Sequence, residues 1–136
     1  MKKLFLFIAI QFTINLAFSQ DMLTKNAPEE LAQEQLEEYN ARDIDAFLAP
    51  YAEDVELYTF PNELNTKGKS EMRKQYEQMF ANTPDLHCEL VNRIVNGNTV
   101  IDHERITGFS KGKAFEAVAI YKIGEGKIKK VYFIKK

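Results

Sequence analysis

Three segments in the first part of the chain repeat apolar residues at helical spacing. The first starts near Asn26, a candidate cap, has Pro28 and acids in its first turn, and extends to about Ala41. Asp43 is a candidate cap for a second, shorter helix, and the third segment, Lys69–Ala81, carries an apolar stripe. The pattern therefore predicts three N-terminal helices.

The period of the apolar residues changes to two along Asp54–Phe60, which predicts a strand followed by a loop at Pro61. After Pro84 the chain alternates again, with an Asn-Gly turn at position 96 that is typical of a hairpin. Helices followed by a sheet indicate an α+β domain with its helices on one face of the sheet. The later strands are expected at His87–Val95, Asn98–Phe109, Lys113–Ile123 and Lys127–Ile134.

The first twenty residues have the pattern of a secretory signal peptide. Two lysines precede an apolar run, Leu4–Phe18, and Ser19-Gln20 follows as the exit. The run is shorter than a membrane span and contains three polar breaks. We expect cleavage after Gln20, with Phe18 and Ser19 as alternatives, and an exported domain over 21–136, periplasmic or secreted and without a membrane anchor.

Composition narrows the range of partners and cofactors. The 136 residues carry 18 basic and 20 acidic side chains, so the basic surface that nucleic-acid binding requires is not expected. One cysteine cannot form an internal disulfide, and with two histidines it cannot complete a closed zinc site. Neither a metal nor another cofactor is expected.

Two stretches resemble the nuclear transport factor 2-like superfamily, in particular its SnoaL-like branch. They are Tyr39–Phe47 leading into Ala52–Val55, and Ala119–Ile123 followed by a glycine turn and Gly126–Ile128. The resemblance implies a cone in which a curved mixed or antiparallel sheet wraps around the helices and encloses an apolar pocket, with sheets often pairing into homodimers. Members of the superfamily include isomerases, epoxide hydrolases, cyclases, dehydratases and proteins without catalysis, so the fold alone does not define a reaction.

The resemblance to ketosteroid isomerase gives a first test of chemistry. That enzyme uses a carboxylate base and an oxyanion hole made of a tyrosine and a protonated acid. Laid on this chain, Gln35 occupies the place of the tyrosine, Thr59 that of the base, and Ala119 lies near that of the acid. A threonine hydroxyl cannot act as the carboxylate does, so steroid isomerisation by that route is not expected. Tyr76 matches a tyrosine that lines the pocket in that family.

Limonene-epoxide hydrolase gives a second test, because it activates water with an Arg-x-Asp strand and a further aspartate. Glu104-Arg105-Ile106-Thr107 resembles that strand and keeps Arg105, but Thr107 replaces the first aspartate and the second falls near Phe133. The water would have no evident base. Together the two comparisons predict a cavity without a catalytic carboxylate.

Alternation along the 98–109 strand places His103 and Arg105 on one face, with Asp102 and Glu104 on the other. If Arg105 faces the pocket, His103 does too, and the pair would supply an acid or base near neutral pH and a guanidinium for an anionic group. The alternative is that both pair with acids across the sheet. His103 and Arg105 are the catalytic candidates of the sequence.

The expected function is the binding of a small apolar or amphipathic molecule in the conical pocket. Two alternatives stay open: a cofactor-independent isomerase, lyase or hydrolase that uses His103 and Arg105, and a non-catalytic homodimeric interaction domain. The lysines near the C-terminus, Lys135 among them, indicate a solvated edge that discourages strand pairing. Candidate ligand-binding residues are Thr59, Tyr76, Ala119, Phe133, Tyr58 and Tyr39.

Overall fold

The computed structural model describes residues 26–110 and 112–135, so the predicted signal peptide and its cleavage site lie outside the described residues. Within the described ranges, no helix is long and apolar enough to cross a membrane. Three helices and six strands follow in the order α1 (Pro28–Ala41), α2 (Ile44–Leu48), β1 (Tyr51–Thr59), β2 (Glu63–Lys67), α3 (Lys69–Asn82), β3 (His87–Asn96), β4 (Thr99–Ser110), β5 (Lys113–Gly124) and β6 (Lys127–Lys135).

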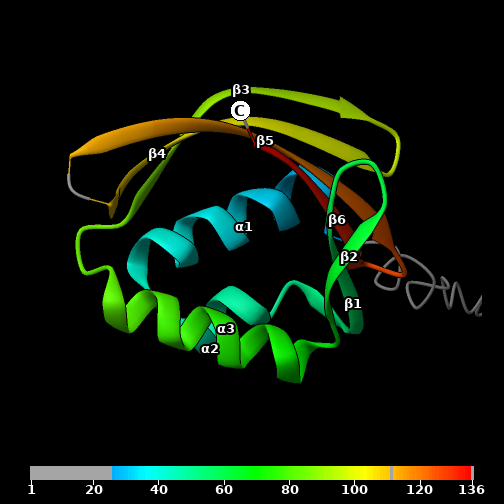
Figure 1. The fold of residues 1–136 in the computed structure, drawn as a ribbon. Coiled ribbons are helices and arrows are strands. Elements are labelled where there is room, and N and C mark those ends of the chain that lie inside the picture. The colour runs from blue at the N-terminus through cyan, green and yellow to red at the C-terminus, as the bar shows by residue number, and fades with distance from the viewer. Residues whose placement is uncertain (1–25, 111, 136) are drawn as a thin grey trace, which may run out of the picture.

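The α+β class predicted from the sequence is confirmed. The six strands form a single sheet in the order β2-β1-β6-β5-β4-β3, antiparallel at every pair except the parallel pair β1 and β6. Figure 1 shows the sheet arching over α1, with α2 and α3 on the far side of that helix. The strongly curved sheet and the enclosed helices give the expected cone.

Helix capping follows the sequence in one case and departs from it in the other. Asp43 caps α2, since its Oδ1 accepts a hydrogen bond from the backbone N–H of Ala46 at 3.1 Å. Asn26 is not the cap of α1. The capping position is Ala27, whose backbone N–H donates to the Glu30 side chain at 3.1 Å.

Two strand expectations are wrong. The segment after Pro61 contains β2, which pairs with β1; only Thr66 is buried there, so no apolar alternation marks it in the sequence. The C-terminal lysines do not mark an edge, because β6 lies inside the sheet between β1 and β5. Lys129 and Lys130 instead reach across to Asp54 and Glu56 on β1, at 3.1 and 3.2 Å.

The core lies between the concave face of the sheet and the helices. Burying a large apolar side chain contributes roughly 1.5–3 kcal/mol, so this layer supplies most of the favourable free energy of folding. Strand β4 turns Val100, Asp102, Glu104 and Ile106 toward the helices, all of them buried. Helices and strands both contribute fully buried members of the core, among them Leu31, Phe47, Val55, Met72, Val100 and Val131.

A glycine fixes the end of β4. Gly108 has a φ of 73°, and a Cβ at this position would overlap the backbone carbonyl of Asp85 in the loop before β3. The pairing of β4 with β5 is interrupted between Ile106 and Ser110. The strand therefore bends at Gly108, directly before Phe109.

Candidate functional site

A cavity of about 210 Å³ lies between the concave face of the sheet and the helices. Gln35 and Tyr39 reach it from α1 and Tyr76 from α3, while β3 to β6 provide the opposite wall. The partial exposure of some lining residues marks its mouth, where Phe109 is 47% exposed. The lining is mostly apolar and aromatic, with Phe47, Met79, Ile106, Phe109, Phe115 and Phe133 among its members.

A row of hydrogen bonds crosses the interior and ends on a carboxylate. The Tyr51 hydroxyl donates to Oε1 of Gln35 at 3.1 Å, and Nε2 of Gln35 donates to the Tyr121 hydroxyl oxygen at 2.9 Å. The Tyr121 hydroxyl in turn donates to Oε1 of Glu104 at 3.2 Å. All three bonds run in the same direction, so Oε1 of Glu104 is an acceptor, and a proton on this carboxyl belongs on the other oxygen.

The environment of Glu104 favours its neutral form. Burial, and after it the negative charge of Asp102, raise the pKa of Glu104 from its ordinary value of 4.5 to about 7. Hydrogen bonds from Tyr121 and the Cys88 thiol, together with the charge of Arg93, oppose the shift. A carboxyl with this pKa can donate or accept a proton near neutral pH.

Asp102 is the second buried carboxylate of β4, and it is fully paired. Arg93 on β3 donates two hydrogen bonds to it, from Nε to Oδ1 at 2.7 Å and from Nη2 to Oδ2 at 2.8 Å. The same guanidinium also donates to the Gln33 side chain on α1. Asp102 is therefore a structural anion, whereas Glu104 faces the cavity, and no hydrogen bond or ion pair within residues 26–110 and 112–135 joins it to a cation.

The phenols and the thiol around the cavity stay protonated. Burial raises the pKa of Tyr39, Tyr51, Tyr76 and Tyr121 well above that of a free phenol. Burial and the neighbouring Glu104 also raise the pKa of the Cys88 thiol, so it is not an activated nucleophile. Across the described ranges, no three His, Cys, Asp or Glu side chains gather closely enough to hold a metal ion.

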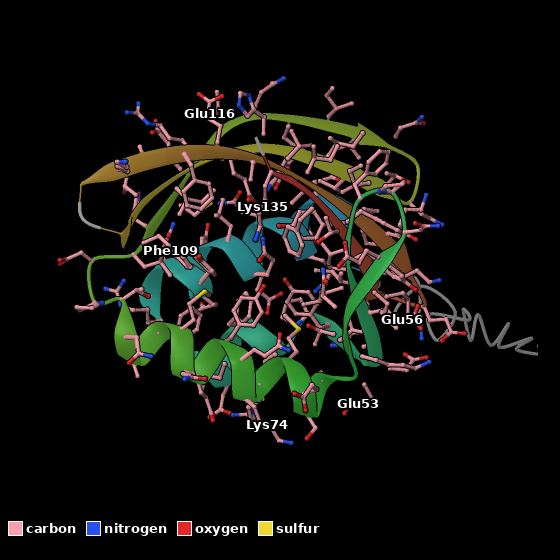
Figure 2. All side chains as sticks on the ribbon, viewed as in Figure 1. Glu53, Glu56, Lys74, Phe109, Glu116 and Lys135 are labelled. Carbon is pink, nitrogen blue, oxygen red and sulfur yellow. The ribbon has the colours of Figure 1, made fainter. Side chains whose placement is uncertain are left out.

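The structure places His103 and Arg105 on the convex face of the sheet, away from the cavity. His103 Nε2 lies 3.0 Å from Oε2 of Glu116, which is the pairing with a neighbouring acid that the sequence offered as the alternative. Arg105 is exposed and lies between Glu89 and Glu116 in the sheet register. Figure 2 shows Glu116 on this outer side. A catalytic role for the pair stays a prediction that the cavity does not support.

Three of the six candidate ligand-binding residues line the cavity, namely Tyr39, Tyr76 and Phe133. Ala119 is buried in the core on the concave face but is not part of the lining. Thr59 lies exposed at the end of β1, where Asn65 donates to its hydroxyl at 2.8 Å. Tyr58 does not line the cavity; its ring stacks on Tyr132 with centroids 4.8 Å apart, and its hydroxyl donates to Glu56.

The expectation of a cavity without a carboxylate is wrong, because Glu104 lines it. The positions compared with the two enzyme families do lack acids, but β4 supplies one from a different position. Sequence reasoning also missed Lys135, which lies on the concave side of β6 in Figure 2 and lines the mouth. For Glu104, the available sequence signal was the alternation along β4, which put Glu104 on the face of the strand opposite to that of Arg105.

Comparison with known families and structures agrees with this architecture. Residues 32–131 match the SnoaL-like domain. A cystatin fold protein from Novosphingobium aromaticivorans has 25% identity and a TM-score of 0.76, covering 81% of this chain and 99% of that one. An NTF2-like protein of unknown function from Cytophaga hutchinsonii has 18% identity and a TM-score of 0.70, covering 85% of this chain and 95% of its own.

A proposed polyketide cyclase from Sinorhizobium meliloti is also similar, with 13% identity and a TM-score of 0.68 over 77% of this chain and 94% of that one. These identities of 13% to 25% carry the fold and not the activity. Comparison with curated proteins gives no match. Since the SnoaL-like match covers most of the sequence and the curved sheet with its helices agrees with the fold of the similar structures, the chain belongs to the family of SnoaL-like domains.

Proposed function

We propose that the domain binds a small, largely apolar organic molecule in the cavity, with one polar group of that molecule facing Glu104. The supporting observation is the contrast within the lining, where aromatic rings surround a single buried carboxyl at the end of the Tyr51-Gln35-Tyr121 row. Apolar walls with few convergent polar groups are typical of ligand sites. The fixed row orients the carboxyl before a ligand arrives, which lowers the cost of binding.

The volume of the cavity limits the size of the ligand. About 210 Å³ exceeds the roughly 150 Å³ that holds benzene in an engineered protein cavity, but is below the ~300–1,000 Å³ of drug-sized pockets. A single-ring aromatic compound, a monoterpenoid or a short branched chain fits this space. A four-ring steroid or polyketide does not fit within it as the cavity stands.

A second candidate function is proton-transfer catalysis without a cofactor, as in an isomerase or lyase. The pKa of Glu104 at about 7 favours this candidate, because both protonation states are populated under working conditions. Protonated Glu104 would donate to a ligand carbonyl, and ionised Glu104 would remove a proton from the adjacent carbon. This candidate moves the acid-base role from the exposed His103 to Glu104.

Binding is tested by a thermal-shift screen that compares single-ring acids, phenols and monoterpenoids with steroids. A ligand at a hundred times its dissociation constant stabilises the fold by about 2.7 kcal/mol, which raises the melting temperature by several degrees. Ala117→Leu adds volume to the cavity wall and should abolish these shifts. Ala114→Leu on the same strand, at an exposed position, is the matched control and should keep them.

Catalysis is tested on a ligand from that screen that carries a ketone. In deuterated water, wild type should exchange the hydrogen next to the carbonyl faster than buffer does, as followed by proton NMR. Glu104→Gln should bind the ketone and lose the exchange, while His103→Ala should keep both. Equal exchange by wild type and Glu104→Gln would exclude Glu104 as the base and leave binding as the function.

Export and dimer formation complete the proposal. The basic and apolar start of the chain supports export after residue 20, and N-terminal sequencing of the protein recovered from its native compartment tests it. Exposed apolar side chains such as Ile134 and Val91 support self-association through the sheet. Sedimentation velocity at several protein concentrations measures whether the mature domain is a dimer.

A further inference from the structure

The two charged residues of the cavity occupy one row across the sheet. Glu104 on β4 is the register partner of Ala117 on β5, and Ala117 is the partner of Lys135 on β6. Paired residues on neighbouring strands point to the same face, and all three line the cavity. Of the described residues, only Glu104 and Lys135 bring charged groups to the lining.

The space between these two residues is open because the middle member of the row is small. Strands lie about 4.8 Å apart, so the backbones at Glu104 and Lys135 are separated by roughly 10 Å with a methyl group between them. Lys135 is exposed at the mouth, whereas Glu104 is 7% exposed at the inner end. None of the ion pairs among the described residues involves Lys135.

We propose that the cavity selects small carboxylic acids, whose carboxylate pairs with the Lys135 ammonium while the apolar body lies over Ala117 and an acceptor at its other end meets Glu104. The inference rests on the proposed function and names the chemical class of its ligand. The rings of Phe115 and Phe133, next to Ala117 and Lys135 on the same face, provide the apolar contact.

The order of the charges favours an anion over a cation. A ligand enters past Lys135, whose ammonium attracts a carboxylate and repels an amine. At the inner end, the neutral form of Glu104 neither repels the anion nor pairs with a cation, and it donates a hydrogen bond. Arg93 and Asp102, whose charges act on Glu104, are bound to each other and do not line the cavity.

The test measures the binding of 3-(4-hydroxyphenyl)propanoate, whose phenol oxygen is the acceptor for Glu104, and of its neutral amide by isothermal titration calorimetry at pH 6. Both probes have one ring and the same length, and the amide replaces the carboxylate charge with a neutral polar group. Wild type should bind the acid about fivefold more tightly than the amide, as expected for a partly exposed ion pair, and the preference should decrease with added salt. An amine of the same length, 3-(4-hydroxyphenyl)propylamine, should bind more weakly than the amide.

Lys135→Met removes the charge and keeps an unbranched apolar side chain. It should weaken the acid about fivefold and change the amide by less than twofold. Lys74→Met is the control, because Lys74 lies on the outer side of α3 (Figure 2) and, among the described residues, forms a hydrogen bond and ion pair only with Glu71. It should leave both affinities unchanged. Melting temperatures of both variants confirm that each is folded.

The outcomes separate this inference from the proposed function. If acid and amide bind equally, or Lys135→Met weakens both alike, selection of carboxylates is overturned and binding in the cavity stands. If the amine binds best, Glu104 is the anionic partner and the inference is overturned as well. If no single-ring compound of any charge binds wild type, the proposed function fails together with the inference.

Discussion

The Tyr121 hydroxyl holds the Glu104 carboxyl inside the cavity, with 3.2 Å between the two oxygens. Tyr121 is itself held by Gln35, so the position of the acid depends on a residue of the first helix. Glu104 is only two residues from Asp102, yet Asp102 alone is paired with an arginine. Strand β4 therefore carries two buried acids: Arg93 compensates the charge of Asp102, whereas the protonation of Glu104 responds to pH.

The stability of the fold should fall as pH rises through the range in which Glu104 ionises. The folded chain keeps this proton up to pH about 7, whereas the unfolded chain releases it near 4.5. The folded state therefore binds more protons than the unfolded state in this interval, and the free energy of unfolding decreases by about 3 kcal/mol between pH 4.5 and 7. Urea denaturation at pH 4.5, 6 and 8 measures the effect.

Glu104→Gln is the control for that dependence, since the amide oxygen still accepts from Tyr121 and carries no charge. The variant should match wild type near pH 4.5 and exceed its stability at pH 8. Groups that face Glu104, including Cys88, Tyr121 and the Arg93-Asp102 pair, are present in both proteins. Parallel pH profiles for the two proteins would show that Glu104 does not titrate in this range.

Breaking the pair of Arg93 and Asp102 from one side should be costly. Arg93→Met leaves Asp102, which is 0% exposed, without its cation, and this should reduce the free energy of unfolding by about 3–5 kcal/mol. The double variant Arg93→Met/Asp102→Leu removes the buried charge too and should recover most of that loss. Chemical denaturation of the single and double variants measures the interaction free energy between Arg93 and Asp102. Additive effects of the two substitutions on the free energy of unfolding would contradict this prediction.

The sequence predicted the two faces of β4 but not which face turns inward. Burying two carboxylates is unfavourable unless they find partners, and the alternation of one strand does not show whether such partners exist. The partners that make the opposite choice stable are Arg93 on another strand and Tyr121 on a third. Only the assembled sheet brings them together, so the alternation placed Glu104 opposite to Arg105 but could not show that Glu104 faces the cavity.

Cys88 should be almost unreactive in the folded protein. It is 5% exposed, and burial together with Glu104 raises the pKa of its thiol, so little thiolate forms at pH 8. As Cys88 is the only cysteine, Ellman's reagent reports on it directly. We expect the native rate to be at least ~100-fold below the rate in denaturant, and a cavity ligand should lower it further. Rapid native labelling would mean that the cavity admits the reagent freely.

Gln35 should contribute to stability through both of its bonds to tyrosines. Gln35→Leu fills similar volume but leaves the Tyr51 and Tyr121 hydroxyls short of a buried partner, at a cost of about 1–3 kcal/mol. Gln78→Leu, at an exposed position on α3, should change stability by less than about 0.5 kcal/mol. The denaturation midpoints of both variants are compared with that of wild type. Equal shifts would mean that the buried row of hydrogen bonds at Gln35 contributes no more to stability than the exposed Gln78.

Local signals were sufficient for most of the architecture. The helices and the strands β3 to β6 appear where periodicity and turn residues put them, because each has a buried face. Strand β2 was missed because it is held by backbone pairing with β1 and buries only Thr66. The prediction of a solvated edge at Lys135 is wrong because a sequence does not reveal the parallel pairing of β1 with β6 that makes its strand internal.

The bend at Gly108 has a consequence for redesign of the domain. Next to the mouth residue Phe109, the chain touches the backbone of Asp85, and no side chain can be removed there to make room. Single substitutions of lining residues, at Ala117 or Met79 for example, can change the shape of the cavity so that it accepts different ligands. On this side the mouth is formed where the backbone at Gly108 packs against the backbone of Asp85. Substitutions inside the cavity would therefore change its volume and leave the width of this part of the mouth nearly constant.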